Sequence, residues 1–197
     1  MKKKGILLFV CCLVCTLGFS QNNTRFLTVE PNHSTIGFRI PISGGLTLVT
    51  GKFTEFDLEL SLANGDWTQA QASFSIQVKS INTGIDERDK HLQSPDFFDV
   101  EKYPTITFVS EKITAIDSTH FVASGTFSMH GIEKNISLPF QVLGAEGNTI
   151  GIQIRTSLNR VDYEVGGGFQ HSTMPDFLGN EVEVEINFWT KRDKRKD

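Results

Sequence analysis

The chain has 197 residues, 39% of them hydrophobic and 21% charged, and a formal net charge of −4. This length suits a single domain with a sizeable core. The acidic balance argues against nucleic acid as a partner, because proteins that bind nucleic acid present clustered positive charge.

The first twenty residues, MKKKGILLFVCCLVCTLGFS, have the composition of a secretory signal peptide. Three lysines precede an apolar run over residues 6–19, and the small residues Gly18 and Ser20 favour cleavage before Gln21. The run is shorter than the roughly 20 apolar residues that a membrane-spanning helix needs. We therefore expect the signal peptide 1–20 to be removed from a periplasmic or secreted protein.

Cleavage at this position would change both the thiol content and the charge of the protein. All three cysteines, Cys11, Cys12 and Cys15, lie in the removed segment, which leaves no thiol for disulfides or metal binding. Loss of the three lysines takes the formal charge from −4 to −7. A lipoprotein anchor on Cys15 is the alternative, and Val14 disfavours it because a small residue is expected before a lipidated cysteine.

Apolar and polar residues alternate with a period of two through most of the remaining chain. The pattern covers residues 33–40, 58–62, 72–78, 104–113, 120–129, 136–142, 150–154 and 182–188. Such alternation is typical of strands with one buried and one solvent-facing side. Turn pairs such as Asn64-Gly65 and His130-Gly131 separate the segments. About eight or nine antiparallel strands at this spacing predict an all-β barrel or a two-sheet sandwich.

Residues 88–108, RDKHLQSPDFFDVEKYPTITF, interrupt the alternation and predict a short helical insertion around residues 84–99. Thr83 is placed to cap a first helix, with an acidic residue three positions later. Ser94 is placed to cap a second short turn, because Pro95 follows it. Tyr103 precedes a proline and is therefore expected to be extended, so that the next strand begins there.

The same insertion concentrates polar groups, but their spacing does not fit a metal site. Asp89 and His91 are two positions apart and point to different faces of a helix. Glu87 and His91 have suitable spacing but lack a third ligand. The sequence also has no G-x-S-x-G, H-E-x-x-H, phosphate-loop or dinucleotide-binding motif. We therefore predict no catalytic residue, no metal and no cofactor, and a structural role for most of these polar groups.

The interior of an eight-stranded barrel is either filled by side chains or holds one small ligand. Fourteen of the sixteen phenylalanines follow residue 20 and could serve either purpose. Alternation alone also leaves open an outer-membrane barrel, in which the apolar face points outward. The helical insertion and the charged C-terminal tail 191–197, KRDKRKD, argue against that alternative.

Six blocks of this sequence resemble those of YceI-like domains, in the same order. They are ExNHSTIGF at 30–38, GKFTEFD at 51–57, INTG at 81–84, RDKHLQSPDFFDVEKYPTITFVS at 88–110, SMHGIEK at 128–134 and NRVDY at 159–163. The resemblance implies an extended, eight-stranded antiparallel lipocalin-like barrel over residues 21–190. It also implies a carrier or sequestering protein for polyisoprenoids or similar long-chain lipids. The segment 41–48 lacks a histidine often found there, and the loop 164–180 is long.

The inward positions of the alternating strands predict the apolar lining of such a barrel. They are Phe38, Phe53, Phe74, Ile76, Phe108, Phe127, Leu138, Phe140, Ile152, Ile154, Val184 and Ile186. Arg88, His91 and Arg160 are the candidates for contact with the ligand's head group.

Two further questions stay open at this point. The main alternative function is a hydrolase or isomerase that acts on a lipid held in the barrel, with Arg88, Asp89 and His91 as its machinery. The sequence also leaves open a transient contact with a membrane surface and a homodimer. The basic tail is expected to be a solvated terminus.

Overall fold

The computed structural model describes residues 23–172, 174 and 177–196. The predicted signal peptide and the expected new N-terminus at Gln21 lie outside the described residues. None of the helices in the described part of the chain is long and apolar enough to cross a bilayer.

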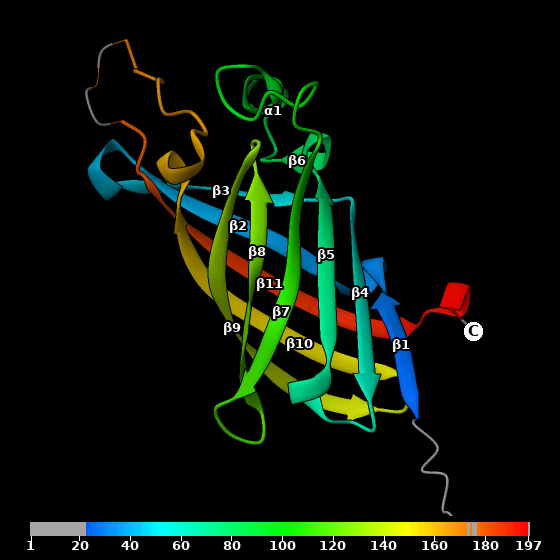
Figure 1. Ribbon diagram of the computed structural model, residues 1–197. Coiled ribbons are helices and arrows are strands. Elements are labelled where there is room, and N and C mark those ends of the chain that lie inside the picture. The colour runs from blue at the N-terminus through cyan, green and yellow to red at the C-terminus, as the bar shows by residue number, and fades with distance from the viewer. Residues whose placement is uncertain (1–22, 173, 175–176, 197) are drawn as a thin grey trace, which may run out of the picture.

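The fold is all-β, and the described residues form eleven antiparallel strands and one short α-helix (Figure 1). The strands are β1 (Thr24–Val29), β2 (Thr35–Ile42), β3 (Thr47–Phe53), β4 (Phe56–Ala63), β5 (Gln71–Gln77), β6 (Ile81–Asn82), β7 (Thr105–Ala115), β8 (His120–Met129), β9 (Ile132–Glu146), β10 (Thr149–Asn159) and β11 (Glu181–Arg192). The helix is α1 (Asp86–Gln93). Each segment with strict alternation coincides with a strand, apart from Val78, which begins a 3-10 turn after β5, and only β1, β3 and β6 lie outside the predicted segments.

Eight strands close into a barrel, as the resemblance to YceI-like domains implied, and not into the two-sheet sandwich that the alternation also allowed. The hydrogen-bonded order is β1-β4-β5-β7-β8-β9-β10-β11, and β1 pairs with β11 to complete the ring. The remaining strands, β2, β3 and β6, extend the sheet from the N-terminal part of β11, which pairs with β2. The barrel is therefore closed at one end and extended by a three-strand wall at the other.

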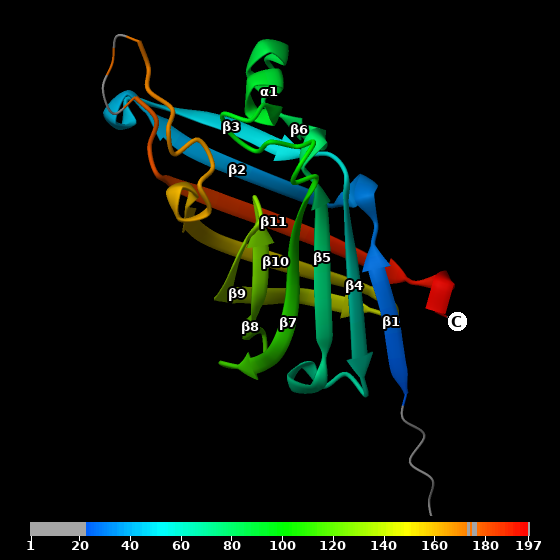
Figure 2. The same ribbon diagram turned by 45° about the horizontal axis from the view of Figure 1, so that its top comes forward.

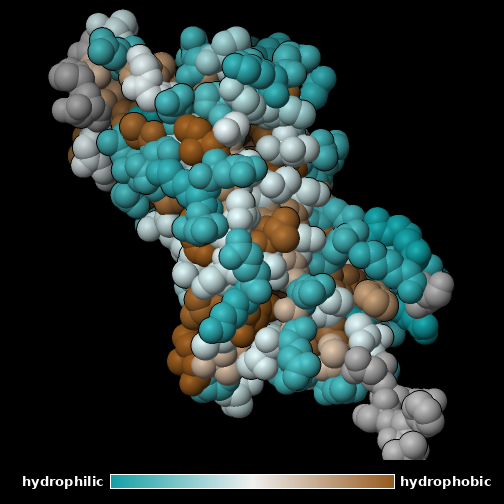
Figure 3. Space-filling model, viewed as in Figure 1, coloured by the Kyte–Doolittle hydropathy of each residue, from teal (hydrophilic) through white to brown (hydrophobic). Residues whose placement is uncertain are grey.

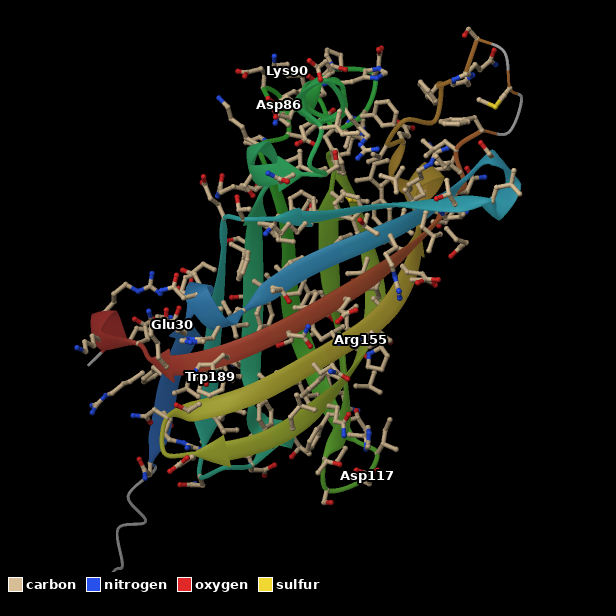
Figure 4. All side chains as sticks on the ribbon, turned by 180° about the vertical axis from the view of Figure 1, so that it is seen from behind. Glu30, Asp86, Lys90, Asp117, Arg155 and Trp189 are labelled. Atoms are coloured by element: carbon tan, nitrogen blue, oxygen red, sulfur yellow. The ribbon has the colours of Figure 1, made fainter. Side chains whose placement is uncertain are left out.

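The long strand β11 produces this change of neighbours. Its C-terminal part pairs with β1 through Thr190–Val29, whereas its N-terminal part pairs with β2 through Ile186–Ile36. Figures 2 and 4 show the resulting wall of β3, β2, β11 and β10 running obliquely across the strands β5, β7 and β8. The two sets of strands diverge toward the end that carries α1.

The apolar side of each alternating strand faces the interior. In β4, Leu58, Leu60 and Leu62 are buried, while Glu59 between them is exposed. The face of the molecule shown in Figure 3 is mainly hydrophilic, with hydrophobic residues in separate patches. This orientation is the reverse of the one that the outer-membrane alternative needs, because such barrels carry their apolar band outside.

The insertion between β6 and β7 contains one helix followed by a short turn. Its α1 begins at Asp86 after Ile85, which provides no side-chain cap, so the prediction of Thr83 as the cap was wrong. The Thr83 backbone amide and hydroxyl donate instead to Asp89, at 2.9 and 2.5 Å. Ser94 does begin a second turn, in which its hydroxyl accepts from the backbone N–H of Asp96 at 3.3 Å. That turn is too short to be a helix.

The basic C-terminal segment is attached to the barrel, which differs from the solvated tail that we expected. Strand β11 continues to Arg192, and the side chain of Asp193 is almost fully buried. Arg195 contacts Asp193 at 2.9 Å and Asp57 at 3.3 Å, so the carboxylate of Asp193 has a charged partner. The pattern of charges gave no indication of these contacts, because the acidic partner Asp57 lies far away in sequence.

Candidate functional site

An apolar cavity of about 210 Å³ lies in the half of the barrel beneath α1. Strands β2, β5, β8, β9 and β11 all contribute to its wall. Eight of the twelve predicted lining residues border it, namely Phe38, Phe53, Phe74, Ile76, Phe127, Leu138, Val184 and Ile186. Their common location beside one cavity shows that these residues share a lining, and their contact with a ligand stays a prediction.

The other four predicted residues, Phe108, Phe140, Ile152 and Ile154, are buried but do not border the cavity. They belong to the opposite half of the barrel, which is filled by aromatic side chains. Phe121 stacks on Phe140 with ring centroids 5.3 Å apart, and Trp67 lies 5.6 Å from both rings. Period-two alternation cannot distinguish these two halves, because it identifies only the inward face.

Phe74 forms the boundary between the cavity and the filled half. Its ring borders the cavity, stacks on Phe108 at 5.5 Å and lies 6.3 Å from Phe188. Aromatic side chains thus do both things that the sequence left open: they fill one half of the barrel and line the other.

The helical insertion covers the cavity with Leu92, Phe97 and Phe98. Phe98 meets Phe53 edge to face at 6.4 Å, which links the insertion to the wall. This apolar contribution was not predicted, since only a structural role of the polar groups in the insertion was expected. The signal was the pair Phe97-Phe98 itself, because two adjacent phenylalanines in a highly charged segment need a place to be buried.

The cavity reaches the surface between β9 and β10. Pairing of these strands ends at Ile154–Phe140, although both strands continue beyond that point. The cavity is bordered there by residues 136–138 of β9 and 156–158 of β10, and Ser137 is exposed. We call this gap the β9–β10 opening; its hydroxyl groups come from Ser137, Thr156 and Ser157.

Arg160 is the one predicted head-group residue that borders the cavity. It is only 7% exposed, and no carboxylate of the described residues forms a salt bridge with it. Burial lowers the pKa of its guanidinium, which nevertheless stays charged at ordinary pH. Its hydrogen bonds go to neutral acceptors: the carbonyls of Val165, Gly166, Leu178 and Gly179, and the side chain of Asn180, at 2.7–3.5 Å.

These contacts identify Arg160 as the residue that holds both ends of the segment between β10 and β11. Its five N–H groups are already used by the protein, so a head group would have to displace one of them. Tyr163 lies beside it on the cavity wall and packs edge to face on Phe127 at 5.4 Å. Burial, and secondarily the charge of Asp162, raises the pKa of the Tyr163 phenol.

The structure separates Arg88 and His91 from the cavity lining. Arg88 donates to the Thr83 hydroxyl at 2.7 Å and to the Thr83 carbonyl at 2.9 Å. His91 lies 3.2 Å from the carboxylate of Asp96 and reaches the cavity only indirectly, through its edge-to-face contact with Phe97 at 5.0 Å. Both side chains form contacts within the insertion and neither borders the cavity. Their contact with a head group therefore stays a prediction.

The described residues contain no group of three or more His, Cys, Asp or Glu side chains that could hold a metal ion. Asp89, the third residue of the alternative catalytic set, accepts hydrogen bonds from Thr83. Arg88, Asp89 and His91 thus all form contacts with neighbouring residues of the insertion, and none of them borders the cavity.

The model of the YceI-like domain matches residues 27–189. The chain belongs to the YceI-like family. Among the curated relatives of this YceI-like chain is a UPF0312 protein of Vibrio cholerae, 25% identical over 189 residues, which cover 93% of the chain and 97% of the relative. A UPF0312 protein of Photorhabdus laumondii is 30% identical over 118 residues, 60% of each chain.

Solved structures show the same YceI-like fold. The crystal structure of Burkholderia cenocepacia BcnA has a TM-score of 0.73 at 20% identity, covering 83% of this chain and 99% of BcnA. A polyisoprenoid-binding domain from Saccharophagus degradans has a TM-score of 0.69 at 17% identity, covering 85% and 98%. The YceI protein of Campylobacter jejuni has a TM-score of 0.62 at 26% identity, covering 76% and 87%. These matches confirm the predicted family and fold.

Proposed function

We propose that this YceI-like protein holds a polyisoprenoid or a similar long-chain amphiphile in its cavity, for transport, storage or sequestration. The observation that carries the proposal is the cavity itself, which is apolar on nearly all sides within an otherwise packed barrel. The likeness to the polyisoprenoid-binding domain of Saccharophagus degradans supports the class of ligand.

Burial of the chain supplies the affinity in this proposal. Each buried methylene contributes about 0.8 kcal/mol, so ten of them contribute about 8 kcal/mol before the entropic costs of association. A buried chain needs no polar partner, which fits a site whose few polar groups are three hydroxyl-bearing residues at the opening, Arg160 and Tyr163.

The size of the cavity suggests how such a ligand lies. Its volume is below the roughly 300–1,000 Å³ of most ligand pockets, so it accommodates only part of a long chain. We propose that the remainder, with the head group, extends through the β9–β10 opening. Ser137, Thr156 and Ser157 would there provide hydrogen bonds to a hydroxyl or phosphate head.

A pair of matched variants on β5 tests the site. Phe74→Asp places a charge at the base of the cavity, and we expect it to abolish binding of fluorescently labelled geranylgeraniol. Ser73→Asp is the control, because Ser73 pairs with Glu59 and the exposed Val109 on the outer face. Equal loss of binding in both variants, each checked for folding by circular dichroism, would refute the assigned location.

A third variant tests the same cavity if Phe74→Asp does not fold. Val184→Phe fills the cavity with an apolar ring and introduces no buried charge. We expect weaker binding at nearly unchanged stability, because β11 keeps its pairing with β2 and β10. Undiminished binding by a folded Val184→Phe protein would place the ligand elsewhere.

We propose that the bound lipid is not turned over. Arg88, Asp89 and His91 are engaged in fastening the insertion, and no metal cluster is present in the described residues. Mass spectrometry of geranylgeraniol and its acetate ester after incubation with the protein should show both compounds unchanged. Conversion that is lost in the Arg88, Asp89 and His91 triple alanine variant would instead support the hydrolase or isomerase alternative.

We also propose export to the periplasm or the medium. The support is the sequence pattern of residues 1–20 alone. N-terminal sequencing of the protein recovered from periplasmic and medium fractions should begin at Gln21. Recovery only from the cytoplasm, with Met1 retained, would contradict this proposal.

A further inference from the structure

We propose that the turn between β2 and β3, residues 42–48, docks the protein onto the surface of a lipid bilayer. We call these residues the hairpin tip. The proposal rests on the proposed function, because the bilayer is the place from which the carried chain is taken or to which it is delivered.

The hairpin tip presents apolar side chains to solvent. Leu46 is 88% exposed and Leu48 is 48% exposed. Single exposed leucines are ordinary on protein surfaces, but residues 40–51 around these two also contain no Asp, Glu, Lys or Arg. The absence of charge matters because charged groups are the most costly to bring into a bilayer.

The structure holds the hairpin tip in place, so the leucines project from a fixed support. The backbone N–H of Ser43 donates to the carbonyl of Phe177 at 2.7 Å, and that of Gly179 donates to Pro41 at 2.8 Å. Between these bonds Ile42 pairs with Leu178. Gly44 and Gly45 have φ angles of 68° and 89°, which allow the tight turn that leads to Leu46.

The apolar surface of the hairpin tip continues into the cavity. Ile40 precedes the tip on β2 and borders the cavity, and Leu178, the partner of Ile42, borders it as well. A chain that leaves the bilayer beside Leu46 could therefore pass along apolar side chains to Phe38. In Figures 1 and 2 the hairpin tip lies at the same side of the molecule as the end of β10, next to the β9–β10 opening.

A bilayer fits the hairpin tip better than a protein partner. A stable protein interface buries at least about 1,000 Å², whereas two leucines and a short turn offer a small contact. Shallow insertion of a few apolar side chains gives a weak, reversible attachment, which suits a carrier. Arg39, the charged residue nearest to the hairpin tip in sequence, pairs with Glu183 at 2.8 Å, so we expect a hydrophobic contact that needs no anionic lipid.

Flotation with vesicles of phosphatidylcholine alone tests the proposal. We expect the wild-type protein to float, and Leu46→Asp and Leu48→Asp each to reduce the bound fraction about tenfold or more. Ile116→Asp is the matched control: Ile116 is 67% exposed but follows β7, beside Asp117, at the opposite end of the molecule from α1 (Figure 4). Its binding should equal that of the wild type.

Three outcomes would overturn the proposal. The wild type could fail to float, or Ile116→Asp could lose as much binding as Leu46→Asp. Binding could also require anionic lipid and vanish in high salt, which would assign the contact to the basic residues near the C-terminus. Sedimentation velocity adds a fourth: a dimer that dissociates on Leu46→Asp would make the hairpin tip a contact between copies of the chain.

Transfer measurements separate this proposal from the proposed function. Labelled geranylgeraniol is offered either in ethanol or in phosphatidylcholine vesicles. Leu46→Asp should load normally from ethanol and about tenfold more slowly from vesicles. If the wild type loads from neither source, lipid binding is refuted. The flotation experiment would still show whether the hairpin tip binds to vesicles. Equal rates from vesicles for wild type and Leu46→Asp would refute docking alone.

Discussion

Arg160 shows at the scale of one residue how neutral acceptors can surround a buried charge, since no carboxylate of the described residues forms a salt bridge with it. Its guanidinium binds both ends of the 164–180 segment through four backbone carbonyls and one side-chain amide. The NRVDY block made this arginine a candidate for ligand contact. The structural role was not predictable, because the acceptors are backbone atoms that the sequence does not distinguish.

Removal of this side chain should be strongly destabilising. Arg160→Ala leaves several buried carbonyls without donors, and we expect the free energy of unfolding to fall by about 3–5 kcal/mol. Arg155→Ala is the control, since Arg155 forms a part-exposed pair with Glu185 and should cost below about 1 kcal/mol. Urea denaturation measures both. Similar values for the two variants would contradict the role assigned to Arg160.

Tyr163 gives a prediction for alkaline pH. Because burial raises the pKa of its phenol in the folded protein, the unfolded chain releases this proton first as the pH rises. Its contribution to stability is therefore complete below about pH 10 and is lost as the pH rises through the folded-state pKa. The stability of Tyr163→Phe should decline less between pH 9 and 11 than that of the wild type. A parallel decline of both proteins would argue against a buried, neutral phenol.

At the scale of elements, the alternation located most strands but could not show where a strand changes partner. The alternation in β11 is uninterrupted, yet this strand pairs with β1 at one end and with β2 at the other. Strand β1 was missed because Leu27, Thr28 and Val29 are all buried, so no alternation is visible. In β3 the alternation is broken by Gly51, whose place Phe38 occupies from the neighbouring strand. The β9–β10 opening arises where pairing between these two strands ends, and that point was not visible in the alternation either.

The β9–β10 opening should control the rate at which the cavity fills. The chain after residue 20 has no cysteine, so Ser137→Cys can be labelled selectively with a bulky maleimide. The label should slow loading of geranylgeraniol from ethanol, because Ser137 lies at the mouth of the cavity. Labelled Thr114→Cys, on the exposed face of β7, is the control and should load like the wild type. An undiminished rate with label at Ser137 would place the entrance elsewhere.

At the scale of the whole molecule, the fold followed from the sequence and the extent of the cavity did not. Most inward residues of the alternating segments are buried, and others, such as Phe38 and Val184, are partly buried against the core, so the apolar interior was predictable. Which of them border empty space depends on bulk. Trp67, Phe121 and Phe140 meet at one end, whereas α1 and the turn after it span the other end with Leu92 and Phe97. Only the three-dimensional arrangement of these side chains decides that one half is filled and the other is hollow.

The most direct measurement of the central claim is lipid extraction. Protein purified without detergent from a bacterial periplasm is extracted with organic solvent, and the extract is analysed by mass spectrometry. We predict an isoprenoid or another long-chain amphiphile in the wild type and in Ser73→Asp, and its loss in Phe74→Asp and Val184→Phe. A wild-type protein that yields no lipid, and that also fails to take up added geranylgeraniol, would contradict the account.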